Sequence, residues 1–293
     1  MNNRNTYTLI DQQNGNLAFK VLPFQSNTYF DHLQRLNFFS LILILEGEGI
    51  IRVDLSEYEL KKNQLLCFTP YQPFLIQAEQ KLEGVAIHFH SDFFCIVKHQ
   101  KEVSCNGILF NNIYQSPILT LDEKDKEQLL SVIEDMKCEM SNSSLAQNDL
   151  IISYLKIFLI HATRMKLKKS PNENLQNEKN TEPELLQSLK NAIETYFKQK
   201  HSASDYANIL NTNARSLAAL SKKYFDKTIT DLISERIIIE AKRELYLTSK
   251  SVREIAFELG FSDEFYFSRF FKNTTDISPS MYRESVGFAR GET

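Results

Sequence analysis

Hydrophobic positions are arranged differently in the two halves of this 293-residue chain. Up to about Tyr114, apolar and aromatic residues come in short runs separated by turn residues such as Glu46-Gly47-Glu48-Gly49 and Thr69-Pro70. We predict strands in these runs, with a hairpin joining the first two: Phe38–Leu45, Ile50–Val53, Glu57–Leu60, Leu65–Phe68, Phe74–Gln77 and Val85–Phe89. Regularly spaced short strands are typical of a small antiparallel barrel or sandwich.

Helical spacing follows the strands. Asp122 is a candidate N-cap for a first helix, whose apolar positions are Leu129, Ile133, Met136 and Met140. A second helix is predicted from about Asp149 to Met165, with a broad apolar face. Both helices are expected to cover the barrel, and alternatively the second offers a face for self-association. Residues 92–96 are expected to form a helix or strand cap over the barrel mouth.

A polar segment divides the chain near its middle. Residues 168–184 hold one large apolar residue, Leu175, among Asn, Glu, Lys and two prolines. Such a segment cannot bury enough surface to offset its ordering entropy. We therefore predict an N-terminal domain over residues 1–167, an exposed linker over residues 168–184 and a helical domain over residues 185–286.

The helical domain contains an internal repeat. Residues 202–210, SASDYANIL, match residues 251–259, SVREIAFEL, with a capping Ser first and a small Ala at the same step. A turn follows in each copy at Asn211 or Gly260, residue types that tolerate the left-handed conformation ending a helix. Second helices are then predicted over Asn213–Tyr224 and Ser262–Lys272. Two copies of helix, tight turn and helix are two helix-turn-helix motifs.

Apolar spacing also orients the helices of this domain. The residues expected to face inward are Leu217 and Leu220 in the first motif and Phe267 and Phe270 in the second. Between the motifs, Ile233, Ile237, Ala241 and Leu245 step by four, so one long amphipathic helix is predicted from Thr230 to Leu247. Pro279 stands at the first position of a last predicted helix.

These motifs resemble the signature of the AraC/XylS family of bacterial transcription regulators. The resemblance covers roughly Glu184 to Ser285 and is carried by Ile255-Ala256, Gly260-Phe261, the run from Phe267 to Lys272, and Pro279-Ser280. It implies two recognition helices that enter successive major-groove segments of double-stranded DNA, which recur on one face about every 34 Å. This chain departs from the family pattern at Asn211, Asp226 and Asp276, where Gly is usual, and at Ala218-Ala219, where a polar pair is frequent.

The exposed side of each second helix supplies the candidate DNA contacts. They are Asn213, Arg215, Ser216, Ala218, Ala219 and Lys222 in the first motif, and Glu264, Phe265, Tyr266, Ser268, Arg269 and Lys272 in the second. Arginine suits guanine, glutamate suits the cytosine amino group, and an apolar ring suits the thymine methyl group. Lys222, Lys223 and Lys272 are expected to meet phosphates. Each residue is alternatively a solvated surface residue, and Arg269 alternatively forms a structural salt bridge.

The strand-rich half resembles the cupin-like sensory domain of the same family, which implies effector sensing and dimerisation. Catalytic cupins carry a His-x-His pair with further metal ligands; here the pair is His88 and His90, without the expected downstream acid and third His. No metal or other cofactor is therefore expected, and no residue identifies an effector. Aromatic residues that form either core or pocket are Phe38, Phe39, Phe68, Tyr71, Phe74 and Phe89.

Composition narrows the class of protein. A hydrophobic fraction of 42% excludes wholesale disorder, and a net charge of −3 argues against a histone-like coat on nucleic acid or membrane. Residues 201–286 hold twelve basic and twelve acidic residues, so modest, salt-dependent non-specific affinity is expected. The polar start lacks a signal peptide and the four cysteines form no CxxC pair, which favours a cytosolic protein with reduced thiols.

The leading interpretation is a sequence-specific DNA-binding transcription regulator, not an enzyme, with a two-domain α+β fold. A cupin-like barrel with two helices would precede a helical domain with two helix-turn-helix motifs joined by a long helix. Its expected partners are DNA, a small-molecule effector, a second copy of the chain and, if it is an activator, RNA polymerase. Two alternatives stay open: a cupin-type metalloenzyme with a helical accessory domain, and a DNA-binding-deficient protein that only heterodimerises.

Overall fold

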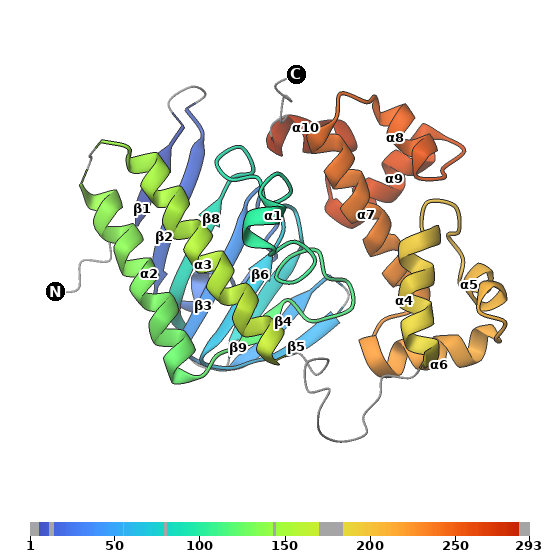
Figure 1. Ribbon diagram of the computed structural model, residues 1–293, viewed down its shortest axis with the longest axis horizontal. Coiled ribbons are helices and arrows are strands. Elements are labelled where there is room, and N and C mark those ends of the chain that lie inside the picture. The colour runs from blue at the N-terminus through green and yellow to red at the C-terminus, as the bar shows by residue number, and fades with distance from the viewer. Residues whose placement is uncertain are drawn as a thin grey trace. The chain divides into compact units, whose positions relative to one another are not determined.

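The computed structural model describes residues 6–11, 15–54, 56–78, 81–142, 145–169 and 184–286. The chain divides into two compact units, Met1–Asn112 with Ser116–Asn174, and Ile113–Gln115 with Leu175–Thr293 (Figure 1). Most of the predicted linker at residues 168–184 lies outside the described residues. Its first two residues end a helix and its last residue, Glu184, begins one.

Two antiparallel sheets form the framework of the first unit. The larger has the strand order β1-β2-β8-β3-β6-β9, in which the strands are β1 (Tyr7–Ile10), β2 (Leu17–Phe24), β3 (Phe39–Glu46), β6 (Gln64–Phe68), β8 (Glu83–Phe89) and β9 (Ile118–Thr120). The smaller has the order β5-β4-β7, with β4 (Gly49–Val53), β5 (Ser56–Leu60) and β7 (Phe74–Ala78). Neither sheet closes on itself within the described residues, so the expected cupin-like barrel is not confirmed. The two sheets instead pack against a shared core, as in the sandwich that the strand spacing also allowed.

The predicted hairpin between Phe38–Leu45 and Ile50–Val53 is wrong. Strand β3 pairs with β6 and β8 in the large sheet, whereas β4 pairs with β5 and β7 in the small one. Burial explains the difference: every residue from Phe39 to Ile44 is buried, so β3 is covered on both faces, while β4 alternates between buried and exposed positions. The actual hairpin joins β4 to β5 beyond Asp54, whose φ is +53°.

A core of aromatic and aliphatic side chains fills the space between the two sheets. Phe68 and Phe74 stack there with ring centroids 4.1 Å apart, among residues such as Ile42 and Ile51 from facing strands. Of the six aromatic residues proposed as core or pocket, four are buried and Phe38 and Tyr71 are partly buried. The core assignment therefore holds for Phe39, Phe68, Phe74 and Phe89.

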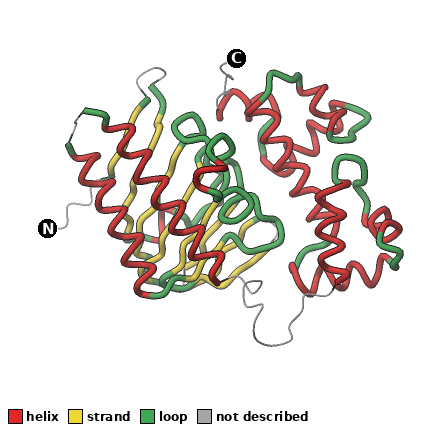
Figure 2. Tube along the Cα trace, in the orientation of Figure 1, coloured by secondary structure: helices red, strands yellow, loops and turns green. Residues whose placement is uncertain are grey.

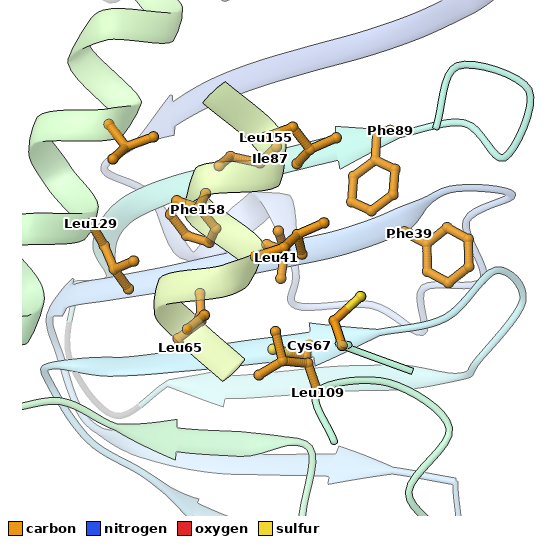
Figure 3. Packing of buried hydrophobic residues seen from close by; sticks show 14 of the residues in the cluster. Phe39, Leu41, Leu65, Cys67, Ile87, Phe89, Leu109, Leu129, Leu155 and Phe158 are labelled. Carbon is orange, nitrogen blue, oxygen red and sulfur yellow. The ribbon is translucent and has the colours of Figure 1, made fainter. Parts of the chain in front are cut away.

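Helices α2 (Glu123–Ser141) and α3 (Gln147–Lys169) cover the other face of the large sheet (Figure 1). Asp122 caps α2 as predicted, because its side chain accepts a hydrogen bond from the Asp125 N–H. Leu155 and Phe158 of α3 pack over Leu41 and Ile87 of the sheet (Figure 3). The two predicted helices and their covering role are confirmed.

Between β8 and β9 the first unit is largely irregular, apart from the short helix α1 (Gln100–Val103). The helix or strand cap expected over residues 92–96 is wrong, since this segment consists of turns and irregular backbone. Phe94 and Ile96 are nevertheless buried in the core under α3. Apolar burial there holds the segment in place without regular backbone pairing.

Helices supply all the regular secondary structure among the described residues of the second unit (Figure 2). Its helices are α4 (Glu184–Tyr196), α5 (Ala203–Ile209), α6 (Ala214–Phe225), α7 (Ile229–Leu247), α8 (Val252–Glu258), α9 (Glu264–Thr275) and α10 (Pro279–Val286). The long connecting helix is confirmed, and its four apolar positions from Ile233 to Leu245 are buried. Pro279 is the first residue of α10, as predicted.

Hydrogen-bonded caps fix where these helices begin. Ser202, Thr228 and Ser251 each form a capping box: the hydroxyl accepts from the third backbone N–H of the helix, and the acid at that position accepts from the backbone of the cap. The turns after α5 and α8 contain Asn211 with φ +49° and Gly260 with φ +82°. Both residues adopt the left-handed conformation that the sequence predicted.

Candidate nucleic-acid interface

Each helix-turn-helix motif brings a short helix against its second helix. The small residues expected at the closest approach, Ala207 of α5 and Ala256 of α8, are both buried. Because alanine has no carbon beyond Cβ, the two helices of each motif can pack closely. The exposed face of α6 or α9 is therefore held on a rigid support. This support positions the candidate contact residues.

Helix α6 turns one face inward and presents the other to solvent. Leu217 and Ser221 are buried, Leu220 is partly buried, and the Ser221 hydroxyl donates to the Lys227 carbonyl oxygen at 2.8 Å. The exposed residues include Arg215, Ser216, Ala218, Ala219 and Lys222. Five of the six residues predicted for this motif thus share the exposed part of the helix.

The sixth residue of the first motif, Asn213, is the N-cap of α6. Its Oδ1 accepts a hydrogen bond from the Ser216 N–H at 2.7 Å, so this oxygen holds the helix start. The residue remains exposed. Its carboxamide nitrogen is the atom that suits a nucleic-acid acceptor.

Helix α9 has a more aromatic exposed face than α6. Phe265 is 76% exposed and Tyr266 is 57% exposed, and their backbone N–H groups are held by the Asp263 carboxylate. Arg269 and Lys272 are exposed, whereas Glu264 and Ser268 are partly buried. The second motif therefore combines two solvent-facing rings with two cations.

The inward face of α9 differs by one position from the expectation. Phe267 and Phe271 are fully buried, whereas Phe270 is only partly buried and packs beside the Phe261 ring at 5.2 Å. Phe271 matches Ser221 of the first motif, which is also fully buried. The buried pair in each helix is thus spaced by four residues, the spacing that keeps side chains on one helix face.

Most cations of the two second helices are not committed to acidic partners. Within the described residues, no ion pair involves Arg215, Lys223, Arg269 or Lys272, so the salt bridge considered for Arg269 does not form there. Lys222 is the exception: its Nζ lies 2.6 Å from Asp226 Oδ1 and donates to the Asp226 carbonyl oxygen. Lys222 thereby helps to cap the C-terminal end of its own helix.

Aspartates end both helices in a left-handed conformation. Asp226 has φ +54° and Asp276 has φ +67°, at the two places where the resemblance led us to expect Gly. Aspartate can occupy this region at modest cost, because its short polar side chain bonds locally. The departures from Gly therefore leave the two helix ends intact.

Charged side chains tie the long helix to the second motif. Lys250 Nζ lies 2.9 Å from Glu244 at the end of α7 and 2.6 Å from Glu258 in α8. The hydrogen bonds to Glu258 and then to Glu244 raise the pKa of Lys250. Arg283 of α10 donates to the backbone carbonyl oxygens of Leu245 and Lys250, so the junction of α7 and α8 is fastened from both sides.

The histidine pair of the first unit lies outside any metal-binding arrangement. His88 is buried, its Nδ1 lies 2.8 Å from the Ser40 hydroxyl, and burial lowers its pKa to about 3, with a smaller effect from Lys20. His90 lies beside Asp92 instead. Throughout the part of the chain that the structure describes, no three His, Cys, Asp or Glu side chains gather closely enough to hold a metal ion.

The buried cysteines are poorly suited to nucleophilic chemistry. Burial raises the pKa of the Cys67 and Cys105 thiols to about 12, so both are protonated at neutral pH. Cys95 is buried as well, and Cys138 is exposed.

No described helix combines the length and the apolarity needed to cross a membrane.

A cleft that the sequence analysis did not identify lies in the first unit, with a volume of about 500 Å³. Its walls come from β1, β2, the segment after β8, and the start of α3, and include Asp11, Asn16, His90, Asp92 and Asn148. These residues are distant in sequence and share no periodic spacing. No local motif could therefore have indicated the cleft.

Comparisons with known proteins agree with the helical geometry of the second unit. Residues 206–285 match a family model described as a helix-turn-helix domain. An uncharacterised HTH-type transcriptional regulator, YfiF, of Bacillus subtilis (strain 168) is 24% identical over 268 residues, which cover 88% of this chain and 80% of the relative. The HTH-type transcriptional activator RhaR of Cronobacter sakazakii is 23% identical over 273 residues, which cover 92% and 91%.

The chain is also similar to a solved structure. The crystal structure of ToxT from Vibrio cholerae O395 covers 96% of this chain and 96% of its own, with 16% sequence identity and a TM-score of 0.40.

Proposed function

Because this chain is a DNA-binding transcription regulator with an AraC/XylS-type helix-turn-helix domain, we propose that α6 and α9 are its two recognition helices. They read two successive major-groove segments on one face of DNA. The observation that supports this role is the exposure, on both helices, of an arginine that no carboxylate neutralises within the described residues. Such guanidinium groups can make bidentate contacts to guanine.

The two helices have different chemistry, so we assign them different base preferences. Arg215 and Arg269 each read a guanine, while Phe265 and Tyr266 pack against thymine methyl groups beside the second motif. Lys223 and Lys272 meet phosphates, which set the register of the protein on DNA. Lys222 contacts a phosphate only once its ion pair with Asp226 has broken.

The remaining candidates shape the contact surface. Ala218 and Ala219 let the α6 backbone approach the groove closely and can touch a thymine methyl group. Ser216 and Ser268 supply hydroxyl groups, and Asn213 supplies its carboxamide nitrogen. Glu264, at the first turn of α9, accepts from a cytosine amino group.

The domain roles follow the division of the sequence. Residues 1–167 form a cytosolic regulatory and dimerisation domain, residues 168–184 a linker and residues 185–286 the DNA-binding domain. Helix α3 is the self-association element, because Leu150 and Ile157 are 40% and 41% exposed and lie two helical turns apart on one face. A small-molecule effector bound to this domain would bias how the two recognition helices are presented, and RNA polymerase is a partner if the protein activates transcription.

A selection from random DNA with the full-length protein tests the base contacts. Arg215→Ala should cost about 1–3 kcal/mol and relax preference at one base position, and Arg269→Ala should do so in the other half-site. Arg253→Ala is the matched control, because Arg253 lies on α8 over the Phe257 ring. Uniform weakening on every sequence would make these arginines phosphate contacts, and the absence of any enriched sequence would refute the proposal.

A further inference from the structure

The cleft of the first unit has the size and composition of a small-ligand site. Its volume of about 500 Å³ falls in the range of ligand pockets in proteins, about 300–1,000 Å³. Leu17, Phe93 and Ile152 supply apolar wall, while carboxylate, carboxamide and imidazole groups supply the polar part. An apolar surface with a few convergent polar groups is the usual form of such sites.

The charge of the lining has one sign. Asp11 and Asp92 contribute carboxylates, and no Lys or Arg is among the described residues that line the cleft. The carboxamide oxygens of Asn16 and Asn148 add neutral acceptors. A ligand that brings a positive charge and several N–H donors matches this set, whereas an anion would meet two like charges.

His90 forms part of the cleft wall beside the Asp92 carboxylate. The Asp92 backbone N–H donates to His90 Nδ1 at 3.3 Å, so this nitrogen acts as an acceptor. The same nitrogen lies 3.5 Å from Asp92 Oδ2. The His90 side chain is 11% exposed, and the Asp92 side chain is 34% exposed.

The position of the cleft connects it to the helix that we assign to self-association. Asn148 and Ile152 belong to the first two turns of α3, and the opposite wall comes from β1 and β2. A ligand held between these walls would fix the start of α3 against the sheet edge. This connection rests on the proposed regulatory function of the first unit.

We propose that this cleft binds a small organic cation, a primary amine carrying an apolar body, and that this amine is the effector of the protein. The ammonium group pairs with Asp92 and Asp11, and the apolar body lies against Phe93 and Ile152. The carboxamides of Asn16 and Asn148 accept the remaining N–H groups.

Calorimetric titration of the full-length protein tests this assignment. The probes are phenethylamine, cyclohexylamine and putrescine at millimolar concentration, with phenethyl alcohol and glucose as neutral counterparts. We expect the amines to bind, and phenethyl alcohol to bind at least about tenfold more weakly than phenethylamine, the ratio that corresponds to about 1.4 kcal/mol. Asp92→Asn and Asp11→Asn should each weaken amine binding by about the same factor.

Asp135→Asn is the matched control. Asp135 is exposed on α2 and does not line the cleft, so this substitution removes one negative charge elsewhere on the protein. It should leave amine affinity unchanged, and circular dichroism confirms that each variant is folded. Binding of no amine, equal binding of phenethyl alcohol, or equal loss in Asp135→Asn would each overturn the assignment. A DNA selection on the same protein separates the outcomes, since sequence-specific enrichment without amine binding leaves the proposed DNA-binding function standing.

Discussion

Replacing Gly260 by Ala should destabilise the second helix-turn-helix motif far more than the equivalent change in the first. Gly260 has φ +82°, and a Cβ built there would overlap the carbonyl oxygen of Lys198 and lie 3.3 Å from the His201 ring. A left-handed Ala costs about 1–2 kcal/mol, and overpacking against a fixed backbone adds about 1–3 kcal/mol. The expected loss is therefore about 2–5 kcal/mol.

Amide hydrogen exchange of the full-length protein localises this loss. Protection in α8 and α9 should fall at least about 30-fold, because each 1.36 kcal/mol corresponds to a factor of ten. Strands β3 and β8 of the other unit should be unaffected. Asn211→Ala is the matched control: Asn211 occupies the same turn with φ +49° and already carries a Cβ. Its protection loss should stay below about tenfold.

Equal exchange in Gly260→Ala and in the unchanged protein would refute the reasoning. It would mean that the turn relaxes to another backbone conformation without loss of stability. DNA binding provides a second readout, since Gly260 lies in the turn between α8 and α9 and helps to set the direction in which α9 leaves that turn. A destabilised turn should weaken binding to a two-half-site target more than binding to the first half-site alone.

Three further predictions concern stability and binding. Burial is the main reason that the pKa of His88 is lowered from 6.5 to about 3. The contribution of the neutral imidazole to folding stability is therefore complete above pH 6.5 and is lost as the pH falls toward 3. Between pH 6.5 and 5 the free energy of unfolding of the first unit should fall by about 2 kcal/mol. Thermal melting followed by the infrared band of the sheet checks this, and a pH profile that is unchanged in His88→Gln would contradict it. Asp226→Gly should remove the strain of a left-handed aspartate and free Lys222 from its ion pair. In a fluorescence-anisotropy titration, DNA affinity should then rise and its salt dependence should steepen by about one counterion. An unchanged salt dependence would show that Lys222 does not reach DNA. Ser251→Ala removes the capping box of α8 and should lower stability by about 0.5–2 kcal/mol, seen as faster amide exchange in α8, whereas Ser251→Thr should keep most of the protection.

The helical unit was predictable because its signals are local. A capping Ser, an acid three residues later, an Asn or Gly in the turn and a four-residue apolar step all act within one or two helical turns. The predicted starts of the connecting helix and of the helix at Pro279 agree with α7 and α10 to within one residue. The inward position of Phe271 was missed, because a row of aromatic residues from Phe265 to Phe271 satisfies more than one helical face.

Strand pairing was predictable only in part, since it depends on residues far apart in sequence. The sequence indicated six strands of the first unit, but it suggested that β3 and β4 pair with each other, and burial on both faces of β3 became visible only in the structure. Strand β2 was not predicted, because Lys20 and Pro23 interrupt its apolar pattern and the residues with which it pairs in β8, such as Gly84 opposite Phe24, lie far along the chain. The cleft was equally hidden, because four separate segments build it.

If α6 and α9 read DNA as proposed, the contacts that fasten the junction between α7 and α8 constrain which DNA sites the protein can occupy. Lys250 and Arg283 resist bending where the connecting helix meets the second motif. With about 10.5 base pairs per turn of DNA, one inserted base pair rotates a half-site by about 34° around the duplex axis. The protein cannot follow that rotation without breaking these contacts. Its operators should therefore keep one separation between half-sites, and spacing, as much as base identity, should distinguish them from chance matches.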